Sequence, residues 1–332
     1  MIDRPDNKRG GNMRAKWLVL VGVVYLSQVA FPAFAQDKIK MVIGQRGIWD
    51  GSLPELGQGA GIFKKHGLDL ELVYTQGTGE TLQAVISGSA DIGGGLGTLG
   101  VMGAFAKGAP IRIIAANMTG ANDTYFYVPA NSPLKTLKDA AGRKVAISTT
   151  GSSTHMAAME LMKLHDVKFD LVTTGGPPQT FTTAMSGQVD VGWAAAPFGV
   201  EAIEQGRIRV IGRASDVVAL RTQTSRVLAA NLGSLERRGE VYERFMKAYR
   251  ETIDYMYGDN PQVLKDYAAF AGVSEAMAKR VRDEFFPRAL VMPDEIKGHD
   301  QLMADAVELK FISAPLSKEQ IAGLVQLQRP IP

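Results

Sequence analysis

The sequence predicts an α/β protein with two lobes of the same construction, and two observations support this prediction. Strand-like and helix-like segments alternate along residues 38–193, a pattern typical of βαβ units and parallel sheets. A segment also recurs, because SGSADIG at residues 87–93 matches SGQVDVG at residues 186–192. A chain of 332 residues is long enough for two domains with cores of their own.

The first cycle of this alternation has strands predicted at residues 38–44, 69–74, 91–93 and 111–116, with a helix over 78–87. The second has strands predicted at residues 144–148, 169–174 and 189–193, with helices over 154–164 and 179–186. The rest is predicted to be helical at residues 240–257, 261–271, 274–285 and 317–327, with Pro261 opening one helix and Ser317 and Gln320 forming a capping box.

These elements predict the domain boundaries. We expect residues 36–120 together with 235–332 to form lobe 1, and residues 121–234 to form lobe 2. Open α/β sheets bind ligands beyond the carboxyl ends of their strands. Two such lobes facing each other therefore predict a clamshell with a ligand held between them.

The amino terminus has the pattern of a secretory signal peptide. Positive charges at Arg14 and Lys16 precede an apolar run that closes with Ala33-Phe34-Ala35, a small-x-small cleavage site. We expect residues 1–35 to be removed after Ala35, which leaves a periplasmic protein, with an uncleaved membrane anchor as the alternative. The start is either Met1 or Met13.

The composition narrows the classes of function. Of 37 basic and 34 acidic residues, the first 35 positions hold five and two, so the remainder is neutral overall and a nucleic acid partner is not expected. The chain has no cysteine, which excludes disulfides, thiolate metal sites and a cysteine nucleophile.

Motifs for catalysis, cofactors and metals are missing or incomplete. GLGTLG at residues 95–100 follows a strand, but the next strand offers no acidic residue for a dinucleotide ribose. We therefore expect no cofactor, and interpret Gly97 and Thr98 as bare backbone that a ligand approaches closely. The four histidines show no metal-ligand spacing, and no G-x-S-x-G elbow occurs, so neither a metal site nor catalytic residues are predicted.

The start of the predicted helix after residue 153 is the first candidate ligand site. Thr150, Gly151, Ser152, Ser153 and Thr154 follow a strand, and helix N-termini expose amides that attract anions. No acid lies three residues after Ser152, Ser153 or Thr154, whereas Ser52 and Glu55 form a capping box in the first lobe. Helix capping without any ligand is the alternative interpretation.

Two further segments are expected to face the same cleft. Arg46 either pairs with a ligand or with Asp50 on the surface, while Trp49 is expected to form a wall of the cleft, as are Pro197 and Phe198. Trp193 lies inside a predicted strand, and we expect it in the core.

Residues 61–71 (GIFKKHGLDLE) resemble a segment of the periplasmic binding proteins for nitrate, taurine and alkanesulfonates. The resemblance continues in order through residues 84–93, KGAP at 107–110, SPLKTLKDAAGRKV at 132–145 and residues 187–197, and it covers roughly residues 38–260. It implies a two-lobed type II periplasmic-binding-protein clamshell, similar in fold to thiamin-precursor synthases, that delivers a small solute to an ABC importer. The related enzymes carry a cysteine-rich motif, which this chain lacks.

The sequence therefore predicts an exported, monomeric solute-binding protein that captures a small organic anion, sulfonate- or carboxylate-like, and works with the permease of an ABC importer. In this hypothesis Arg46 and the amides of Ser152–Thr154 hold the charge, and Trp49 and Phe198 enclose the remainder. The alternatives are a neutral heterocycle, such as a pyrimidine vitamin precursor with Asp50 as its polar partner, and an enzyme on the same fold.

Overall fold

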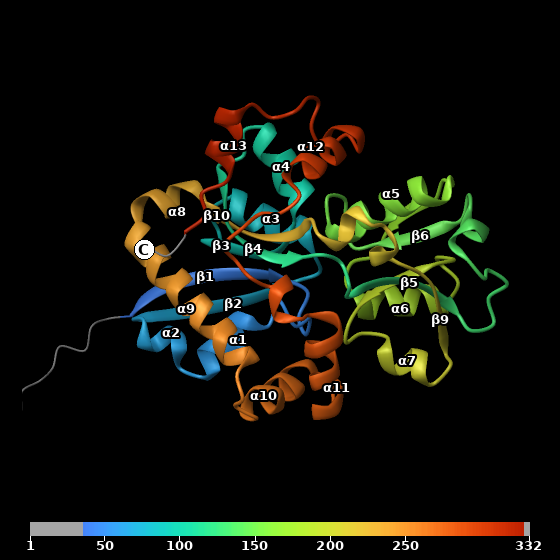
Figure 1. The fold of residues 1–332 in the computed structure, drawn as a ribbon, viewed down its shortest axis with the longest axis horizontal. Coiled ribbons are helices and arrows are strands. Elements are labelled where there is room, and N and C mark those ends of the chain that lie inside the picture. The colour runs from blue at the N-terminus through green and yellow to red at the C-terminus, as the bar shows by residue number, and fades with distance from the viewer. Residues whose placement is uncertain (1–35, 329–332) are drawn as a thin grey trace, which may run out of the picture. The chain divides into compact units, whose positions relative to one another are not determined.

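The computed structural model describes residues 36–328, which form two lobes, each built around a mixed β-sheet with helices on its faces (Figure 1). The expected signal peptide and its cleavage site after Ala35 lie outside the described residues. Among residues 36–328, no helix combines the length and the apolar character that crossing a bilayer requires.

Lobe 1 is built on a five-stranded sheet in the order β2-β1-β3-β10-β4. β1 runs parallel to β2 and β3, and β10 is antiparallel to both of its neighbours. Helices connect the parallel strands, as βαβ units require. The strands are β1 (Asp37–Gly44), β2 (Leu68–Thr75), β3 (Ile92–Gly97), β4 (Ile111–Thr119) and β10 (Thr224–Asn231), and the helices α1 (Leu53–Gly59), α2 (Ile62–Lys65), α3 (Thr78–Ile86) and α4 (Thr98–Ala106).

Lobe 2 repeats this plan with a three-stranded sheet, β8-β5-β9, beside the pair β6-β7. A parallel bridge between Val145 and Val191 joins the two, so the strands follow one another as β7-β6-β8-β5-β9. The strands are β5 (Thr124–Pro129), β6 (Lys144–Ile147), β7 (Asp170–Thr173), β8 (Gly192–Ala195) and β9 (Ile208–Arg213), and the helices α5 (Ser153–His165), α6 (Pro177–Met185) and α7 (Val200–Glu204).

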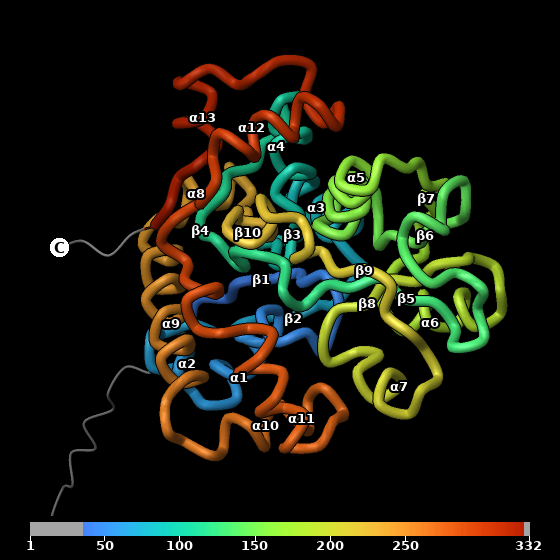
Figure 2. Tube along the Cα trace, turned by 45° about the vertical axis from the view of Figure 1, so that its right-hand side comes forward, coloured from blue at the N-terminus to red at the C-terminus, as the bar shows by residue number. Residues whose placement is uncertain are grey.

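The chain after β10 forms helices that pack on lobe 1. They are α8 (Leu232–Arg237), α9 (Gly239–Tyr257), α10 (Gln262–Ala271), α11 (Glu275–Arg280), α12 (His299–Glu308) and α13 (Lys318–Leu324). α9 lies along α1 and α2, while α12 packs on α4 (Figure 2). α9 buries Val241, Phe245, Tyr249 and Met256 at helical spacing. The predicted capping box at the start of α13 is confirmed, because Ser317 accepts from the amide of Gln320 and the Gln320 side chain accepts from the amide of Ser317.

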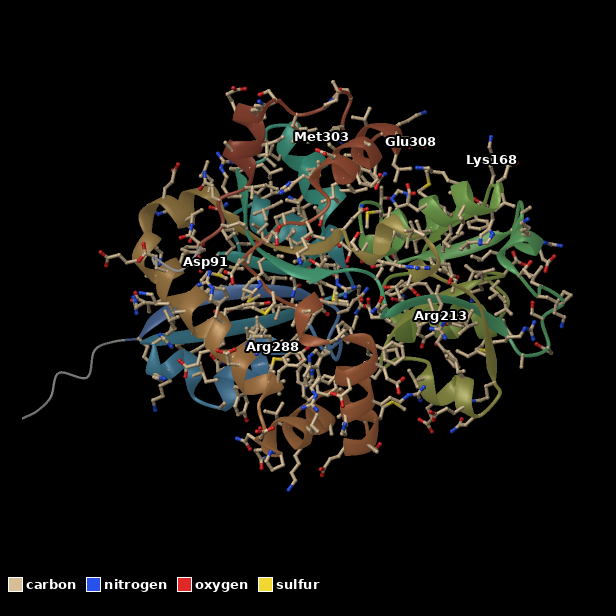
Figure 3. All side chains as sticks on the ribbon, in the orientation of Figure 1. Asp91, Lys168, Arg213, Arg288, Met303 and Glu308 are labelled. Atoms are coloured by element: carbon tan, nitrogen blue, oxygen red, sulfur yellow. The ribbon has the colours of Figure 1, made fainter. Side chains whose placement is uncertain are left out.

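The repeated segment makes the same hydrogen bond in both lobes. Asp91, labelled in Figure 3, precedes β3 and accepts from the amide of Lys40 on β1 at 2.9 Å. Asp190 precedes β8 and accepts from the amide of Lys144 on β6 at 2.9 Å. In each lobe this carboxylate fastens the third parallel strand to the first, so the sequence repeat corresponds to a structural one.

The expected lobe boundary at residue 234 needs correction at β10. The sequence pattern places this strand in lobe 2, but it lies between β3 and β4 in the sheet of lobe 1. Residues 120–123 and 214–223 therefore connect the lobes, between β4 and β5 and between β9 and β10. The partners of β10 are more than 100 residues away in the sequence, so local patterning could not indicate its sheet.

Candidate functional site

A small cavity lies between the lobes where parallel strands of both sheets end. Gly44 closes β1, Ser148 follows β6 and Ala195 closes β8, and all three line it. We call this space the cleft cavity; its volume is about 20 Å³, room for about one water molecule. The remaining lining residues come from both lobes: Gln45, Ile48, Asp50, Gly51, Gly77, Thr78, Gly95, Thr124, Ser152, Ser153, Thr154, Trp193 and Arg226.

Arg226 on β10 is held between two buried carboxylates beside this cavity. Its Nε donates to Asp50 Oδ2 at 2.8 Å, and its Nη1 donates to Asp123 Oδ2 at 3.0 Å. The side chains of Arg226, Asp50 and Asp123 are only 8%, 3% and 0% exposed. Asp50 comes from the loop after β1 and Asp123 from the connection to lobe 2, so this ion-pair cluster lies where the lobes join.

The charges of this cluster are not balanced when both acids are ionised, since one guanidinium faces two carboxylates. Burial raises the pKa of Asp50 above its ordinary value of 3.8, against the opposing influence of Arg226. For Arg226, burial alone would lower the pKa, but the charges of Asp123 and Asp50 raise it, so the guanidinium stays charged. Asp50 therefore accepts a proton at a higher pH than an exposed aspartate does.

Two buried donors on residues that line the cleft cavity have no acceptor among residues 36–328. They are Nη2 of Arg226 and Nε1 of Trp193, whose side chain is 1% exposed. Leaving a buried donor unpaired costs about 1–3 kcal/mol, and native proteins leave few such groups. Both residues border one cavity, so an acceptor bound there would satisfy both donors.

The N-terminus of α5 adds backbone donors to the same place. Ser152 caps this helix by accepting from the amide of His155 at 3.2 Å, and Thr154 Oγ1 accepts from the amide of Ser148 at 2.8 Å. The amides of Ser153 and Thr154 donate to no acceptor in the described chain. No acid lies in the first turn, as expected, so these donors and the positive end of the helix dipole remain available to an anion.

The expected capping box at α1 is wrong. Ser52 occupies the N-cap position, but its hydroxyl donates back to the carbonyl of Trp49 at 2.7 Å and makes no cap bond. Glu55 instead accepts from the hydroxyl of Tyr74 at 3.1 Å. The contrast between the lobes therefore rests on the absence of an acid in α5 and not on self-capping of α1.

Polar contacts across the lobes enclose the cleft cavity. Gln45 Nε2 donates to Ser148 Oγ at 3.1 Å, and the amide of Gly79 donates to Thr149 Oγ1 at 3.2 Å. Farther out, Lys163 on α5 pairs with Glu308 at the end of α12 at 2.9 Å (Glu308 is labelled in Figure 3). A solute larger than a water molecule requires these contacts to separate before it enters.

The structure brings only part of the predicted ligand residues to the cleft cavity. Asp50, Ser152, Ser153 and Thr154 line it. Thr150 is exposed and does not line it, and neither do the other predicted residues: Arg46, Trp49, Gly97, Thr98, Gly151, Pro197 and Phe198.

Arg46 occupies neither of its two expected positions. Its side chain is exposed, and its guanidinium carbon lies 4.5 Å from the centre of the Phe270 ring and 6.0 Å from that of Tyr74. Asp50, its expected partner on the surface, is buried and paired with Arg226 instead. Stacking on aromatic faces therefore directs Arg46 away from the cleft cavity, and Arg226 provides the cation there.

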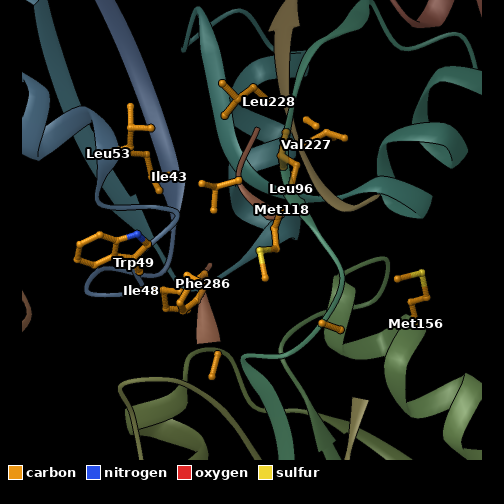
Figure 4. Close-up of a cluster of buried hydrophobic side chains, with 14 of the residues drawn as sticks. Ile43, Ile48, Trp49, Leu53, Leu96, Met118, Met156, Val227, Leu228 and Phe286 are labelled. Carbon is orange, nitrogen blue, oxygen red and sulfur yellow. The ribbon is translucent and has the colours of Figure 1, made fainter. Parts of the chain in front are cut away.

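Trp49 belongs to the core of lobe 1 and forms no wall of the cleft. Its side chain is fully buried, and its Nε1 donates to the hydroxyl of Tyr257 at 2.8 Å. Figure 4 shows its indole in one apolar cluster with Ile48 and Phe286. The polar loop around it conceals this environment in the sequence, because Tyr257 and Phe286 come from the distant C-terminal part.

The bare backbone at Gly97 and Gly100 packs against lobe 2, and neither glycine lines the cleft cavity. A Cβ on Gly97 would clash with the carbonyl oxygen of Gly151, and a Cβ on Gly100 would lie only 2.5 Å from the same atom. Thr98 uses its hydroxyl to bond the carbonyl of Thr224 at 2.7 Å. These glycines thus allow the loop before α5 to pack directly on the turn between β3 and α4.

Pro197 and Phe198 line a different and larger cavity, of about 720 Å³, between lobe 2 and the turn between α10 and α11. The alternation of side chains along β8 explains the separation. Trp193 and Ala195 line the cleft cavity, whereas Ala194 lines the larger one.

Arg226 and Trp193 are the principal residues that the sequence analysis missed. The sequence did contain a signal for Arg226. This arginine lies inside the largely apolar segment 224–231, and an arginine in such a segment is buried only when a carboxylate pairs with it. Trp193 is buried as expected, but its unpaired Nε1 depends on tertiary neighbours. In residues 36–328 no three or more His, Asp or Glu side chains gather in a group suited to a metal ion.

The chain is similar in sequence to a known protein family and to one curated protein. A sequence model of the family described as NMT1/THI5 like matches residues 56–263. A curated protein of Escherichia coli (strain K12), named for binding aliphatic sulfonates, is 29% identical over 175 residues, which are 52% of this chain and 53% of that protein. This chain therefore matches about half the length of that relative.

Solved structures show the same fold at low sequence identity. The periplasmic aliphatic sulphonate binding protein SsuA from Escherichia coli superimposes with a TM-score of 0.65 and 20% identity, over 85% of this chain and 91% of the other. The periplasmic nitrate-binding protein NrtA from Synechocystis PCC 6803 gives a TM-score of 0.69 and 13% identity, over 88% and 86%. The predicted two-lobed type II periplasmic-binding-protein fold is thus confirmed.

Proposed function

The chain belongs to the NMT1/THI5-like family, and from this premise we propose that it is an exported solute-binding protein for a small organic anion. The anion, sulfonate- or carboxylate-like, binds in the cleft cavity and is passed to the membrane permease of an ABC importer. Export rests on the signal-peptide pattern that ends at Ala35. The importer rests on the names of two similar solved structures, a ligand-binding component of an ABC-type import system and a periplasmic protein of a sulfonate ABC transporter.

The observation that carries the proposal is the convergence of unpaired donors at the cleft cavity. Arg226 Nη2 and Trp193 Nε1 are buried without acceptors among residues 36–328, and the amides of Ser153 and Thr154 open a helix beside them. A sulfonate or carboxylate offers two or three acceptor oxygens and a negative charge to these donors. Hydrogen bonds to charged groups contribute about 1.5–3 kcal/mol each, so few are needed for tight binding.

The carboxylates of Asp50 and Asp123 oppose an anion, and they make its binding depend on pH. With both acids ionised, Arg226 is already outweighed by negative charge. When Asp50 takes up a proton, the cluster becomes neutral and the repulsion of a bound anion is removed. Burial raises the pKa of Asp50, so this protonation needs less acid than it would for an exposed aspartate.

The two alternatives lose part of their support from the geometry. A neutral heterocycle keeps Asp50 as a polar partner, but the aromatic sandwich expected from Trp49 and Phe198 is not available at the cleft cavity. An enzymatic activity would need a nucleophile or an acid–base pair, and Asp50 and Asp123 each give one carboxylate oxygen to Arg226.

Native mass spectrometry of protein purified without refolding tests whether a solute is retained. Calorimetry then compares methanesulfonate, acetate and 4-amino-2-methylpyrimidine as probes. Saturable heat with one of the two anions, and none with the pyrimidine, is the expected result. Binding of the pyrimidine alone would overturn the anion assignment in favour of the heterocycle, and absence of binding by all three, with no retained solute, would contradict the site itself.

A further inference from the structure

The larger cavity, which we call the side cavity, is separate from the cleft cavity. The two share no lining residue, and they lie on opposite faces of β8. Its volume of about 720 Å³ falls in the range of small-molecule sites, roughly 300–1,000 Å³. Lobe 2 supplies the walls from β5, α6 and α7, and lobe 1 supplies Val273 and Met277, so an occupant would touch both lobes.

A buried tyrosine whose hydroxyl has no partner among residues 36–328 lines the side cavity. Tyr127 on β5 is 1% exposed, and its Oη has no hydrogen-bond partner among residues 36–328. Its ring and hydroxyl pack on Gly192, where a Cβ would lie 2.5 Å from the ring carbon Cζ and 2.7 Å from Oη. Tyr125, two residues earlier, donates its hydroxyl to the carbonyl of Phe198 and shows that such a group is normally satisfied here.

The other walls are apolar and aromatic. Phe181 on α6 lies 6.4 Å from the Tyr127 ring between ring centres, and Phe198 and Met277 add further apolar surface. Burial raises the pKa of Tyr127, so its hydroxyl stays protonated and remains a donor.

The charged groups at the side cavity lie at its exposed rim. Glu204 pairs with Arg280 of lobe 1 at 2.5 Å, and Glu201 accepts from Gln205 at 2.6 Å. Arg207 extends over the Phe181 ring at 5.5 Å. The interior therefore offers one neutral donor within apolar walls, and the residues that line it contribute no buried charge that would select an ion.

We propose that the side cavity is a second binding site, specific for a neutral and largely apolar organic molecule that places a hydrogen-bond acceptor against the Tyr127 hydroxyl. The donor and the aromatic walls match a ring bearing a carbonyl group. This site is independent of the anion proposed for the cleft cavity, because none of its residues belongs to the ion-pair cluster or to the start of α5.

Fluorine NMR with 4-fluoroacetophenone tests this assignment on the mature protein, residues 36–332. A probe this small binds in about the millimolar range. Val273→Trp, on the partly exposed turn of lobe 1, places a large side chain in the cavity beside Met277 and should weaken probe binding. Tyr127→Phe keeps the ring and should weaken binding about 2- to 12-fold, the effect of one neutral hydrogen bond.

Two control variants distinguish binding in the side cavity from binding elsewhere on the protein. Tyr255→Phe removes a hydroxyl that does not line the side cavity and should leave probe affinity unchanged. Ser153→Asp blocks the cleft cavity and should also leave it unchanged. If Val273→Trp, folded by circular dichroism, binds the probe like the wild type, or if Ser153→Asp abolishes binding, the side cavity is not the site. Equal affinity in Tyr127→Phe would overturn the role of the hydroxyl.

Discussion

Two tryptophans allow a matched test of the anion site, because one indole donor is unpaired within residues 36–328 and the other is satisfied. Trp193 Nε1 borders the cleft cavity without an acceptor, whereas Trp49 Nε1 donates to Tyr257 at 2.8 Å in the core of lobe 1. Both side chains are fully buried, at 1% and 0% exposure. Replacing each by phenylalanine removes the same atoms. The two variants differ only in whether the lost Nε1 donor had an acceptor within the protein.

Trp193→Phe should weaken anion binding and leave stability nearly unchanged. Loss of a hydrogen bond to a charged group is worth about 1.5–3 kcal/mol, which is about 10- to 150-fold in affinity. The variant loses two buried carbons, about 1.6 kcal/mol at about 0.8 kcal/mol each. Removal of an unsatisfied buried donor returns about 1–3 kcal/mol, so the two effects on stability nearly cancel.

Trp49→Phe should show the opposite pattern. It loses the same two carbons and in addition the hydrogen bond to Tyr257, together about 2–3 kcal/mol. At about 2–4 °C per kcal/mol for a chain of this size, Tm should fall by about 4–12 °C, while anion affinity stays at the wild-type value.

Calorimetry with methanesulfonate and thermal unfolding without ligand measure the two effects separately. The reasoning is refuted if Trp193→Phe binds methanesulfonate as tightly as the wild type, because the indole Nε1 would then donate no hydrogen bond to the anion. An equal loss of Tm in the two variants would show instead that the Trp193 donor is satisfied in solution, for example by water.

Four further predictions concern charge, pH, closure and processing. Ser153→Asp should weaken methanesulfonate binding at least tenfold because it places a carboxylate at the start of α5, whereas Arg46→Ala should leave affinity unchanged in calorimetry. Anion affinity should rise as the pH falls toward the raised pKa of Asp50, since protonation removes a negative charge beside the ligand. Asp50→Asn should bind the anion with the same affinity across this pH range. A wild-type affinity that does not change with pH would exclude this coupling. Small-angle scattering should give a smaller radius of gyration with ligand than without it, since entry requires the lobes to separate, and identical profiles at saturation would count against a clamshell. Amino-terminal sequencing of exported protein should begin at Gln36, and recovery of intact residues 1–35 in the membrane fraction would indicate an anchor.

Local patterning was sufficient for the parts of the fold that neighbouring residues decide. The alternation of strands and helices, the SGSADIG and SGQVDVG repeat and the capping box at Ser317 all depend on contacts within a few residues or within one βαβ unit. The start of α5 belongs to the same class, since its cap at Ser152 and the absence of an acid in its first turn are local properties. For this reason the sequence by itself was enough to predict that Ser152, Ser153 and Thr154 lie at the cleft.

Only the tertiary structure decided which side chains meet in the cleft. Arg226 reaches Asp50 across 176 positions and Asp123 across 103, because β10 returns from lobe 2 to the sheet of lobe 1. Long-range packing also places the Trp49 side chain in the core of lobe 1, where it contacts Tyr257. In the sequence, Arg46 in a loop and Arg226 in a strand offer the same guanidinium. The buried carboxylates that pair with Arg226 come from distant segments, and only the folded chain brings those segments together.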